Sequence, residues 1–304
     1  MTSDITPSEE HRKMLLYAVL EEQVTDFMSS YWSAIESRVE KSHGSLNSDA
    51  SFAELPPPIG DSLTNLVQIM GILWNGSDIR DKELLEKLYN ETIDKILGFL
   101  KSLCLHPFHV VQRNPVYEMV IAHLAVLHNF CHNLGSKIND LRQRDTLQTM
   151  HKFRSKDLSD QMKTMSLLVS SYLITEDSSK PEITLGKEEI TYVIGLLGDA
   201  VESKDHKGRR GESNAYHADE LLKGIINIST VEDNKGTLAE CGVLLILVKA
   251  MGVQSESIQL RAVKVVWSLA FDEKVRQRIK SETVHAAGLE DRFPPSACFP
   301  PTSV

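Results

Sequence analysis

The chain has 304 residues, of which 41% are hydrophobic and 25% charged, and a formal net charge of −9. This composition is ordinary for a globular protein, and the negative charge argues against general nucleic-acid binding, because affinity for phosphate comes mainly from clustered Lys and Arg. Neither a signal peptide nor an apolar run of membrane-spanning length is present. We therefore expect a cytoplasmic protein that neither binds nucleic acid nor inserts into membranes.

Hydrophobic periodicity predicts a series of helices and no convincing strand. Residues 1–7 are expected to be disordered, a long amphipathic helix follows over 8–39, and serines with three prolines predict a loop over 42–60. A turn is predicted over 106–115, and residues 204–211 read as a solvated basic connection. Further helices are predicted at 63–74, 82–103, 116–134, 138–152, 159–174 and 187–201.

Metal and thiol chemistry receive little support from the sequence. His128 and His132 are one helical turn apart, a spacing that can bind zinc, but no clear third or fourth ligand accompanies them. We expect these and the neighbouring histidines to pack between helices, with no metal bound. The four cysteines are widely spaced and read as reduced thiols, mostly in the core. The residues concerned are His106, His109, His123, His128, His132, Cys104, Cys131, Cys241 and Cys298.

Catalytic motifs are missing from the sequence. It contains no G-x-S-x-G, no glycine-rich phosphate loop and no paired C-x-x-C. Cys131 and His132 are adjacent, and adjacent helical side chains point about 100° apart, so they do not form a nucleophile and base. We predict no catalytic residue, no cofactor and no enzymatic activity.

A 41-residue repeat is the strongest signal in the chain. The segment from Leu222 to Thr230 returns as Val263 to Phe271, and Lys235 returns as Arg276. All-helical self-similarity at a period of about 40 to 47 residues is typical of armadillo or HEAT units that stack into a solenoid. Such a period indicates a binding scaffold more than a catalyst.

A three-helix unit can be read within this repeat. A short helix runs from Asp233 to Cys241, Gly242 permits a sharp turn, and helices follow over 243–251 and 258–271. The segments 242–248 and 262–272 resemble the armadillo family, over about 216–284 of the chain. The resemblance implies an all-α, armadillo/HEAT-like right-handed α-solenoid over 8–286, most regular over 216–286, with a degenerate N-terminal half and a Pro-rich disordered tail over 287–304.

Asparagines recur at one position of the repeat, at Asn75, Asn129 and Asn227. In armadillo proteins an asparagine at this position of the third helix faces a concave groove and hydrogen-bonds an extended peptide. The alternative is that each asparagine satisfies a neighbouring carbonyl near a helix end. In the last copy the position holds Ser268.

Importin-type armadillo proteins carry a tryptophan four residues before the asparagine, and here those places hold Gly71, Ala125 and Lys223, with Lys264 before Ser268. This substitution argues against nuclear-signal binding and favours an acidic or phosphorylated peptide, because a positive groove attracts negative ligands. Solvent-facing lysines are the simpler alternative. The predicted partner-binding residues are Lys223, Asn227, Lys264, Ser268 and Asn129.

The resemblance implies a non-catalytic armadillo-repeat protein-interaction scaffold in cytosolic signalling, with a protein or extended peptide as partner. The segment from Trp267 to Glu273 is similar to armadillo arrays that precede a TIR domain in invertebrate immune-type proteins. A truncated regulatory array, autoinhibitory or recruiting, of a TIR-domain protein of innate immunity is therefore an alternative function. A small-GTPase regulator of armadillo type is a second alternative.

The repeat stops after Val284, where prolines prevent a further helix. An uncapped stack would expose apolar side chains, covered by the tail through Phe293 and Phe299 or by self-association. Thr302 and Val304 also fit the C-terminal motif that PDZ domains capture. The candidates for the exposed face are Val243, Leu247, Val248, Leu269 and Phe271.

Overall fold

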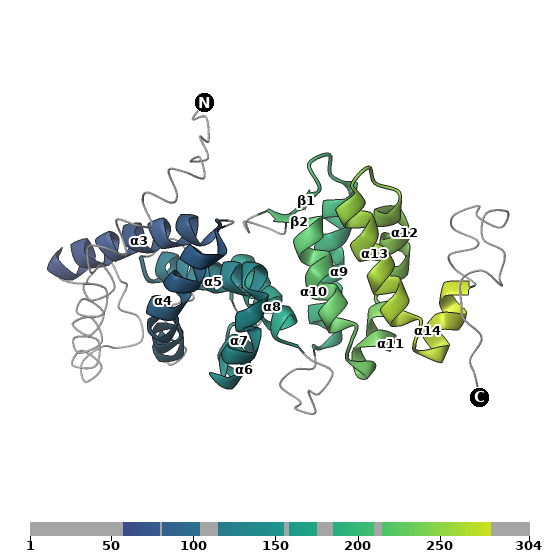
Figure 1. Cartoon of the computed structure of the whole chain (residues 1–304), viewed down its shortest axis with the longest axis horizontal. Helices are drawn as coiled ribbons and strands as arrows, with labels where there is room; N and C mark the ends of the chain where they lie inside the picture. Colours follow the sequence, from purple (N-terminus) through teal and green to yellow (C-terminus); the bar gives the residue numbers. More distant parts are fainter. Residues whose placement is uncertain are drawn as a thin grey trace. The chain divides into compact units, whose positions relative to one another are not determined.

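The computed structural model describes residues 57–79, 81–103, 115–154, 158–174, 185–209 and 215–280. The chain forms two compact units, unit 1 over residues 1–169 and unit 2 over residues 170–304; Figure 1 shows the ribbon. No helix within the described ranges has both the length and the apolar character needed to cross a bilayer. Several predicted features lie outside these ranges: the helix over 8–39, the tail with Phe293, Phe299, Thr302 and Val304, and Cys104, His106, His109 and Cys298.

Unit 1 is built from helices close to the predicted ones. The predicted bounds of 82–103 are confirmed, whereas α3 begins at Pro57 inside the predicted loop, because proline is tolerated in the first turn of a helix. The single helix predicted over 138–152 is wrong: Asp145, with φ of 58°, divides it. The elements are α3 (Pro57–Ser77), α4 (Lys82–Leu103), α5 (Pro115–Asn133), the 3₁₀ turn η3 (Gly135–Lys137), α6 (Ile138–Gln143), α7 (Thr146–Lys152) and α8 (Asp160–Leu173), the last of which continues into unit 2.

Helix α5 is the centre of unit 1. It packs against α3 and α4, and its residues from Met119 to Leu127 are all buried. A helix that is apolar on nearly every side is stable only inside a fold. At its end Phe130 meets Tyr89 of α4 edge to face, with ring centroids 5.3 Å apart.

A polar cluster ties α6 to α4 at the edge of this core. The Tyr89 hydroxyl donates to Oδ2 of Asp140 at 2.6 Å, and Nε of Arg144 donates to the same oxygen at 3.0 Å. The hydrogen bond from Tyr89 holds the pKa of the Asp140 carboxyl below its usual range, and burial raises the pKa of Tyr89. Asp140 therefore stays ionised and acts as an acceptor from both sides.

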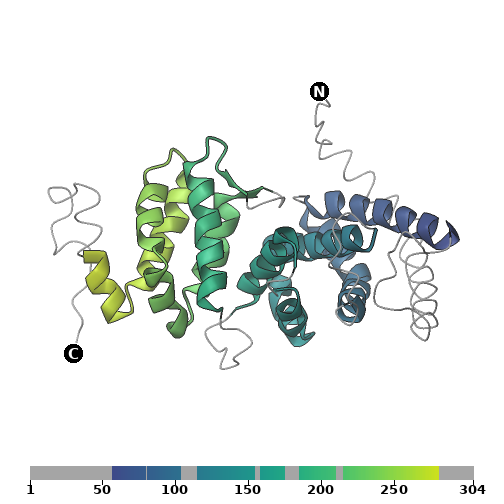
Figure 2. The ribbon, with the colours of Figure 1, turned by 180° about the vertical axis from the view of Figure 1, so that it is seen from behind.

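Unit 2 arranges its long helices in two layers. Helices α9 and α12 contact each other in one layer, α10 and α13 lie side by side in the other, and the layers meet where α10 packs on α9 and α13 on α12. Figure 2 shows the same helices from behind. The elements are α9 (Lys187–Glu202), β1 (Lys207–Gly208), β2 (Tyr216–His217), α10 (Ala218–Ile228), α11 (Glu232–Glu240), α12 (Val243–Met251), α13 (Glu256–Leu269) and α14 (Glu273–Arg278).

The predicted three-helix unit is confirmed by α11, α12 and α13. Gly242 has φ of +84°, the left-handed conformation that lets α11 turn sharply into α12. Helix α10 ends at Ile228 and α13 at Leu269, 41 residues later, and α11 begins at Glu232 and α14 at Glu273, again 41 residues later. The sequence period is thus the period of the helices.

A short hairpin precedes α10 where no strand was predicted. Lys207 pairs with His217 and Gly208 with Tyr216 in two antiparallel strands of two residues each. Lys207 is exposed as predicted for a solvated connection, but Gly208 is buried against α9, where a Cβ would lie 2.2 Å from the carbonyl oxygen of Leu196. The connection is therefore packed against the helices at one point.

Two predictions about burial are corrected. Cys131 is a buried free thiol as predicted, but Cys241 is only half-buried, with its sulfur 3.2 Å from the Thr191 hydroxyl oxygen. Among the candidates for an exposed apolar face, Phe271 is exposed and Val248 is half-buried. The others are buried because their sides of α12 and α13 face the two-layer core: Val243, Leu247 and Leu269.

Candidate partner-binding surface

Four of the predicted binding residues form a row across α10 and α13, which we call the slot row: Lys223, Asn227, Lys264 and Ser268. Lys223 and Asn227 lie on α10, and their equivalents 41 residues later lie on α13. Helices α10 and α13 pack side by side and are joined by Arg261 to Asp219 and by Ser268 to Ser229, so we expect each slot residue to lie close to its equivalent. The row therefore crosses two consecutive repeats.

Capping interactions fix the start of α10 and hence the position of its slot residues. Nδ1 of His217 accepts from the backbone N–H of Asp219 at 3.2 Å, and the Glu220 carboxylate accepts from the backbone N–H of His217 at 3.0 Å. This reciprocal pair satisfies donors that a helix start leaves unpaired. Two turns further on, the helix presents Asn227 near its last turn.

The two lysines of the slot row differ in exposure. Lys223 is half-buried, with its ammonium nitrogen 5.1 Å from the centre of the Tyr172 ring, a cation–π contact. Tyr172 is held in turn by its hydroxyl, which donates to the carbonyl oxygen of Glu220 at 3.3 Å. Lys264 is exposed. Of the two charges, that of Lys264 is thus the more accessible to a ligand.

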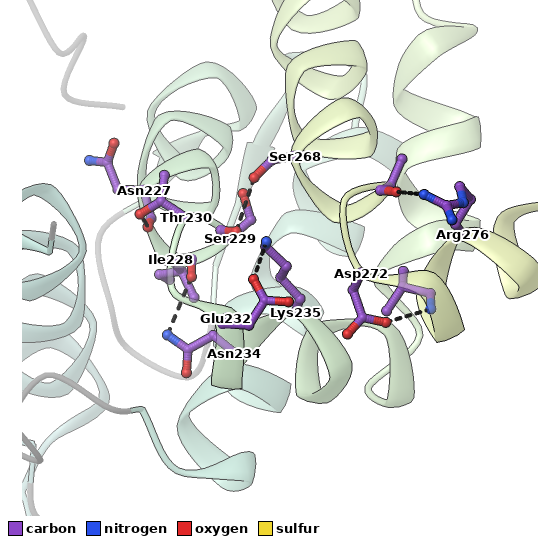
Figure 3. A network of polar contacts seen from close by, with 12 residues as sticks. Asn227, Ile228, Ser229, Thr230, Glu232, Asn234, Lys235, Ser268, Asp272 and Arg276 are labelled. Carbon is purple, nitrogen blue, oxygen red and sulfur yellow. Dashed lines mark hydrogen bonds and ion pairs between the residues drawn. The ribbon is translucent and has the colours of Figure 1, made fainter. Parts of the chain in front are cut away.

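Asn227 and Ser268 also differ in what their side chains contact. Oγ of Ser268 donates to the carbonyl oxygen of Ser229 at 2.9 Å and so joins α13 to the end of α10. The Asn227 amide makes no hydrogen bond with any described residue and points away from this network (Figure 3). Its backbone carbonyl, by contrast, accepts from the Thr230 hydroxyl at 2.7 Å. Asn227 is therefore the slot residue whose amide is available.

Asn129 lies on α5 in unit 1 and is not part of the slot row. Its Nδ2 donates to Oγ of Ser77 at 2.9 Å and to the carbonyl oxygen of Trp74 at 3.4 Å, which joins α5 to the end of α3. Ser77 stands two residues after Asn75, as Ser229 stands two after Asn227. Asn129 and Ser268 thus make the same kind of bond between helices, which is the structural alternative expected for this position.

A second polar arrangement recurs in the first turns of α11 and α14, and Figure 3 shows Glu232, Lys235 and Arg276 of it. Nζ of Lys235 pairs with Glu232 at 2.5 Å, and Arg276 pairs with Glu273, 41 residues later. Nη1 of Arg276 also donates to the carbonyl oxygen of Ala270 at 3.4 Å. Arg276 thus pairs with a carbonyl left unpaired at the end of α13, whereas Lys235 pairs within α11.

An ion pair between α10 and α13 was missed by the sequence reasoning. The Asp219 carboxylate accepts from Nε of Arg261 at 2.6 Å and from the Ser257 hydroxyl. Both partners are less than a third exposed, so the pair fixes the register of the two helices more firmly than a surface ion pair would. The repeat gives no sign of it, because Leu260 occupies the position equivalent to Asp219.

The histidines predicted to pack between helices do so where they are described. His123 is buried and stacks on Phe99, and burial lowers its pKa to about 4, opposed by the hydrogen bond of Nδ1 to the Met119 carbonyl. His128 is also buried, and its ring stacks beside that of His132. In the part of the chain that the structure describes, no three His, Cys, Asp or Glu side chains gather in a way that could hold a metal ion.

Comparison with known proteins gives structural neighbours only. No protein-family model and no curated protein sequence matches the chain. The chain is similar to a designed armadillo repeat protein in complex with the peptide (KR)4, with a TM-score of 0.43 and 16% identity, covering 80% of this chain and 90% of that one. A second neighbour, a computationally designed armadillo repeat protein for modular peptide recognition, has a TM-score of 0.42 and 17% identity, covering 75% and 82%. Independently of these neighbours, the α11–α12–α13 unit and its 41-residue recurrence identify an all-α fold of armadillo type.

Proposed function

We propose that the chain is a non-catalytic protein-interaction scaffold in cytosolic signalling, and that the slot row binds an extended acidic segment of a partner protein. The observation that carries this proposal is that two neighbouring helices, α10 and α13, each present a polar side chain not used within the described fold: the Asn227 amide and the Lys264 ammonium. Asn227 makes no side-chain hydrogen bond with the rest of the described chain, and Lys264 is exposed. Both side chains are thus free to meet a ligand.

These two groups match the chemistry of an extended acidic peptide. A carboxamide has a donor and an acceptor, and can therefore pair with both the N–H and the C=O of an extended backbone. An ammonium group attracts a carboxylate or a phosphate and speeds encounter with an acidic partner. Lys223 adds positive charge to the same row while its ammonium rests on Tyr172.

A charge-reversal experiment tests the proposal. The probe is a short dye-labelled peptide that alternates glutamate and alanine, and binding is followed by fluorescence anisotropy at low and at physiological salt. We expect Lys223→Glu with Lys264→Glu to weaken binding by about tenfold or more and to reduce its salt dependence.

A matched control separates the slot row from a general charge effect. Lys82→Glu with Lys87→Glu makes the same change of net charge at two exposed positions of α4, in unit 1. The control variant should bind the glutamate peptide nearly as well as the parent chain. Equal weakening by both double variants, or no weakening by the slot-row variant, would refute the proposed site.

The cytoplasmic location is part of the same proposal. It rests on the sequence, and on the free thiol of Cys131 buried in unit 1. Imaging of the chain fused at either end to a fluorescent protein tests it. Export from the cell, or accumulation in a membrane-bound compartment, would contradict a cytosolic role.

A further inference from the structure

Helix α13 carries an exposed apolar stripe that the proposed function does not use. The stripe consists of Leu260, Val263, Trp267 and Phe271, at helical spacing along α13 and into the turn after it, and all four are exposed. The rings of Trp267 and Phe271 meet edge to face with centroids 5.2 Å apart, and the Lys235 ammonium lies 5.9 Å from the centre of the Phe271 ring. The aromatic side chains are thus already held in place, which lowers the entropy that binding would cost.

The 41-residue period shows what covers the equivalent surface one repeat earlier. Leu222, the equivalent of Val263, is fully buried, whereas Val263 is 49% exposed. Ile226 is half-buried, and its equivalent Trp267 is 66% exposed. The difference arises because α13 packs against α10. The stripe on α13 therefore corresponds to the surface of α10 that α13 covers. No helix among the described residues covers the stripe itself.

The chemistry of the stripe differs from that of α10 in two ways. In the interface between α10 and α13, Arg261 of α13 pairs with the Asp219 carboxylate of α10. The position equivalent to Asp219 on α13 is Leu260, so a helix that covered α13 would meet an apolar side chain there. The surroundings are also basic. Residues 256–280 contain six Lys or Arg and three Asp or Glu, which gives this segment a net charge of +3, whereas the net charge of the whole chain is −9. Lys264 and Lys274, both exposed, belong to this segment. A matching helix is apolar on one face and acidic on its flanks.

We propose that the α13 stripe docks an amphipathic helix of a partner protein, one that lies on α13 as α13 lies on α10 and carries acidic residues beside its apolar face. Trp267 is the central anchor, because buried tryptophans contribute more to binding than most interface residues. The helix-in-groove mode differs from recognition of an extended peptide. This proposal therefore does not depend on the slot row.

The test uses the full chain and a synthetic helix. The probe is a dye-labelled amphipathic peptide of about five helical turns, with leucine on one face and glutamate on both flanks, and its control carries lysine in place of glutamate. The parent chain should bind the glutamate peptide at least about tenfold more tightly than the lysine peptide. Val263→Ala with Trp267→Ala should weaken binding of the glutamate peptide by about tenfold or more.

A control variant separates the stripe from exposed apolar side chains elsewhere in unit 2. Leu245→Ala removes an exposed apolar side chain from α12, a different helix from the one that carries the stripe, and should leave binding unchanged. Circular dichroism and melting of both variants confirm that each stays folded. Equal affinity for the two peptides, or equal loss in the Leu245 and stripe variants, would overturn the proposal.

Trp267 fluorescence identifies the occupant directly, in a chain where Trp32 and Trp74 are replaced by Phe. We expect Trp267 to be open to acrylamide quenching in the free chain and to become protected, with blue-shifted emission, when the glutamate peptide is added. Protection in the free chain at all concentrations would mean that another part of the chain covers the stripe. Protection that rises with protein concentration alone would mean that a second copy covers it. Either result would overturn the proposal.

Discussion

Burial of His123 makes the stability of unit 1 depend on pH in a calculable way. Its Nδ1 lies 2.7 Å from the Met119 carbonyl, which only accepts, so Nδ1 carries the hydrogen and Nε2 takes up the proton in acid. The ordinary pKa of 6.5 falls to about 4 in the fold because the charged ring would be buried. Between about pH 6.5 and pH 4, His123 is therefore protonated in the unfolded chain and neutral in the folded chain.

The magnitude follows from this difference in pKa. At 1.36 kcal/mol per pKa unit, the shift corresponds to about 3 kcal/mol, lost as the pH falls from about 6.5 to about 4, and about 2 kcal/mol of it is lost by pH 5. Above pH 7 both states are neutral at this residue, so the loss vanishes. Acidification thus destabilises the fold, and the effect levels off below the folded pKa.

Urea unfolding at pH 7 and pH 5 measures this loss. His123→Asn keeps a donor near the Met119 carbonyl but does not titrate. From pH 7 to pH 5 the free energy of unfolding should therefore fall by about 2 kcal/mol less in this variant than in the parent chain. Parallel pH dependence in the parent and His123→Asn chains, or an NMR titration of His123 near pH 6.5, would refute the burial effect.

Three glycine substitutions test the backbone of unit 2 by urea unfolding. Gly208→Ala places a Cβ against the Leu196 carbonyl and should cost about 1 to 3 kcal/mol, because backbone must shift. Gly242→Ala, at φ of +84°, should cost about 1 kcal/mol. Gly236→Ala, inside α11 with open space around it, should instead stabilise the unit by up to about 1 kcal/mol, and a uniform effect of the three changes would contradict these assignments.

Most of the helices could be predicted from the sequence, because apolar periodicity and breaker residues report directly on helix interiors and ends. The bounds of α4 and the turn at Gly242 are examples. The hairpin before α10 could not be predicted, because two-residue strands show no alternation and the burial of Gly208 depends on α9. The break at Asp145 was missed since aspartate, unlike glycine, only occasionally adopts a left-handed conformation.

The candidate site was predictable in register but not in exposure. The 41-residue period predicts that Lys223 and Lys264 occupy equivalent positions. The contact of Lys223 with the Tyr172 ring could not be predicted, because Tyr172 lies on another helix and has no place in the repeat. Helix α13 is apolar on two sides, and periodicity alone does not say which side is covered. For this reason Leu269 was expected at the surface, whereas Trp267 is found there.

The repeated asparagine position offers a test that separates binding from stability. Ser268→Ala removes the hydrogen bond to the Ser229 carbonyl and should cost about 1 kcal/mol of unfolding free energy, and Asn129→Ala should cost as much through Ser77. Asn227→Ala removes an amide that hydrogen-bonds no described residue, so its unfolding free energy should change by less than about 0.5 kcal/mol.

Binding should show the opposite order. Asn227→Ala should weaken association with the alternating glutamate peptide by about fivefold or more, since the proposed backbone pair is lost. Ser268→Ala should weaken it less, because its hydroxyl is already bonded within the fold. Unfolding and anisotropy measurements on the same preparations compare the two effects. If Asn227→Ala destabilises the chain as much as Ser268→Ala while leaving affinity unchanged, the asparagine is a structural residue like Asn129, and the slot row does not bind a peptide backbone.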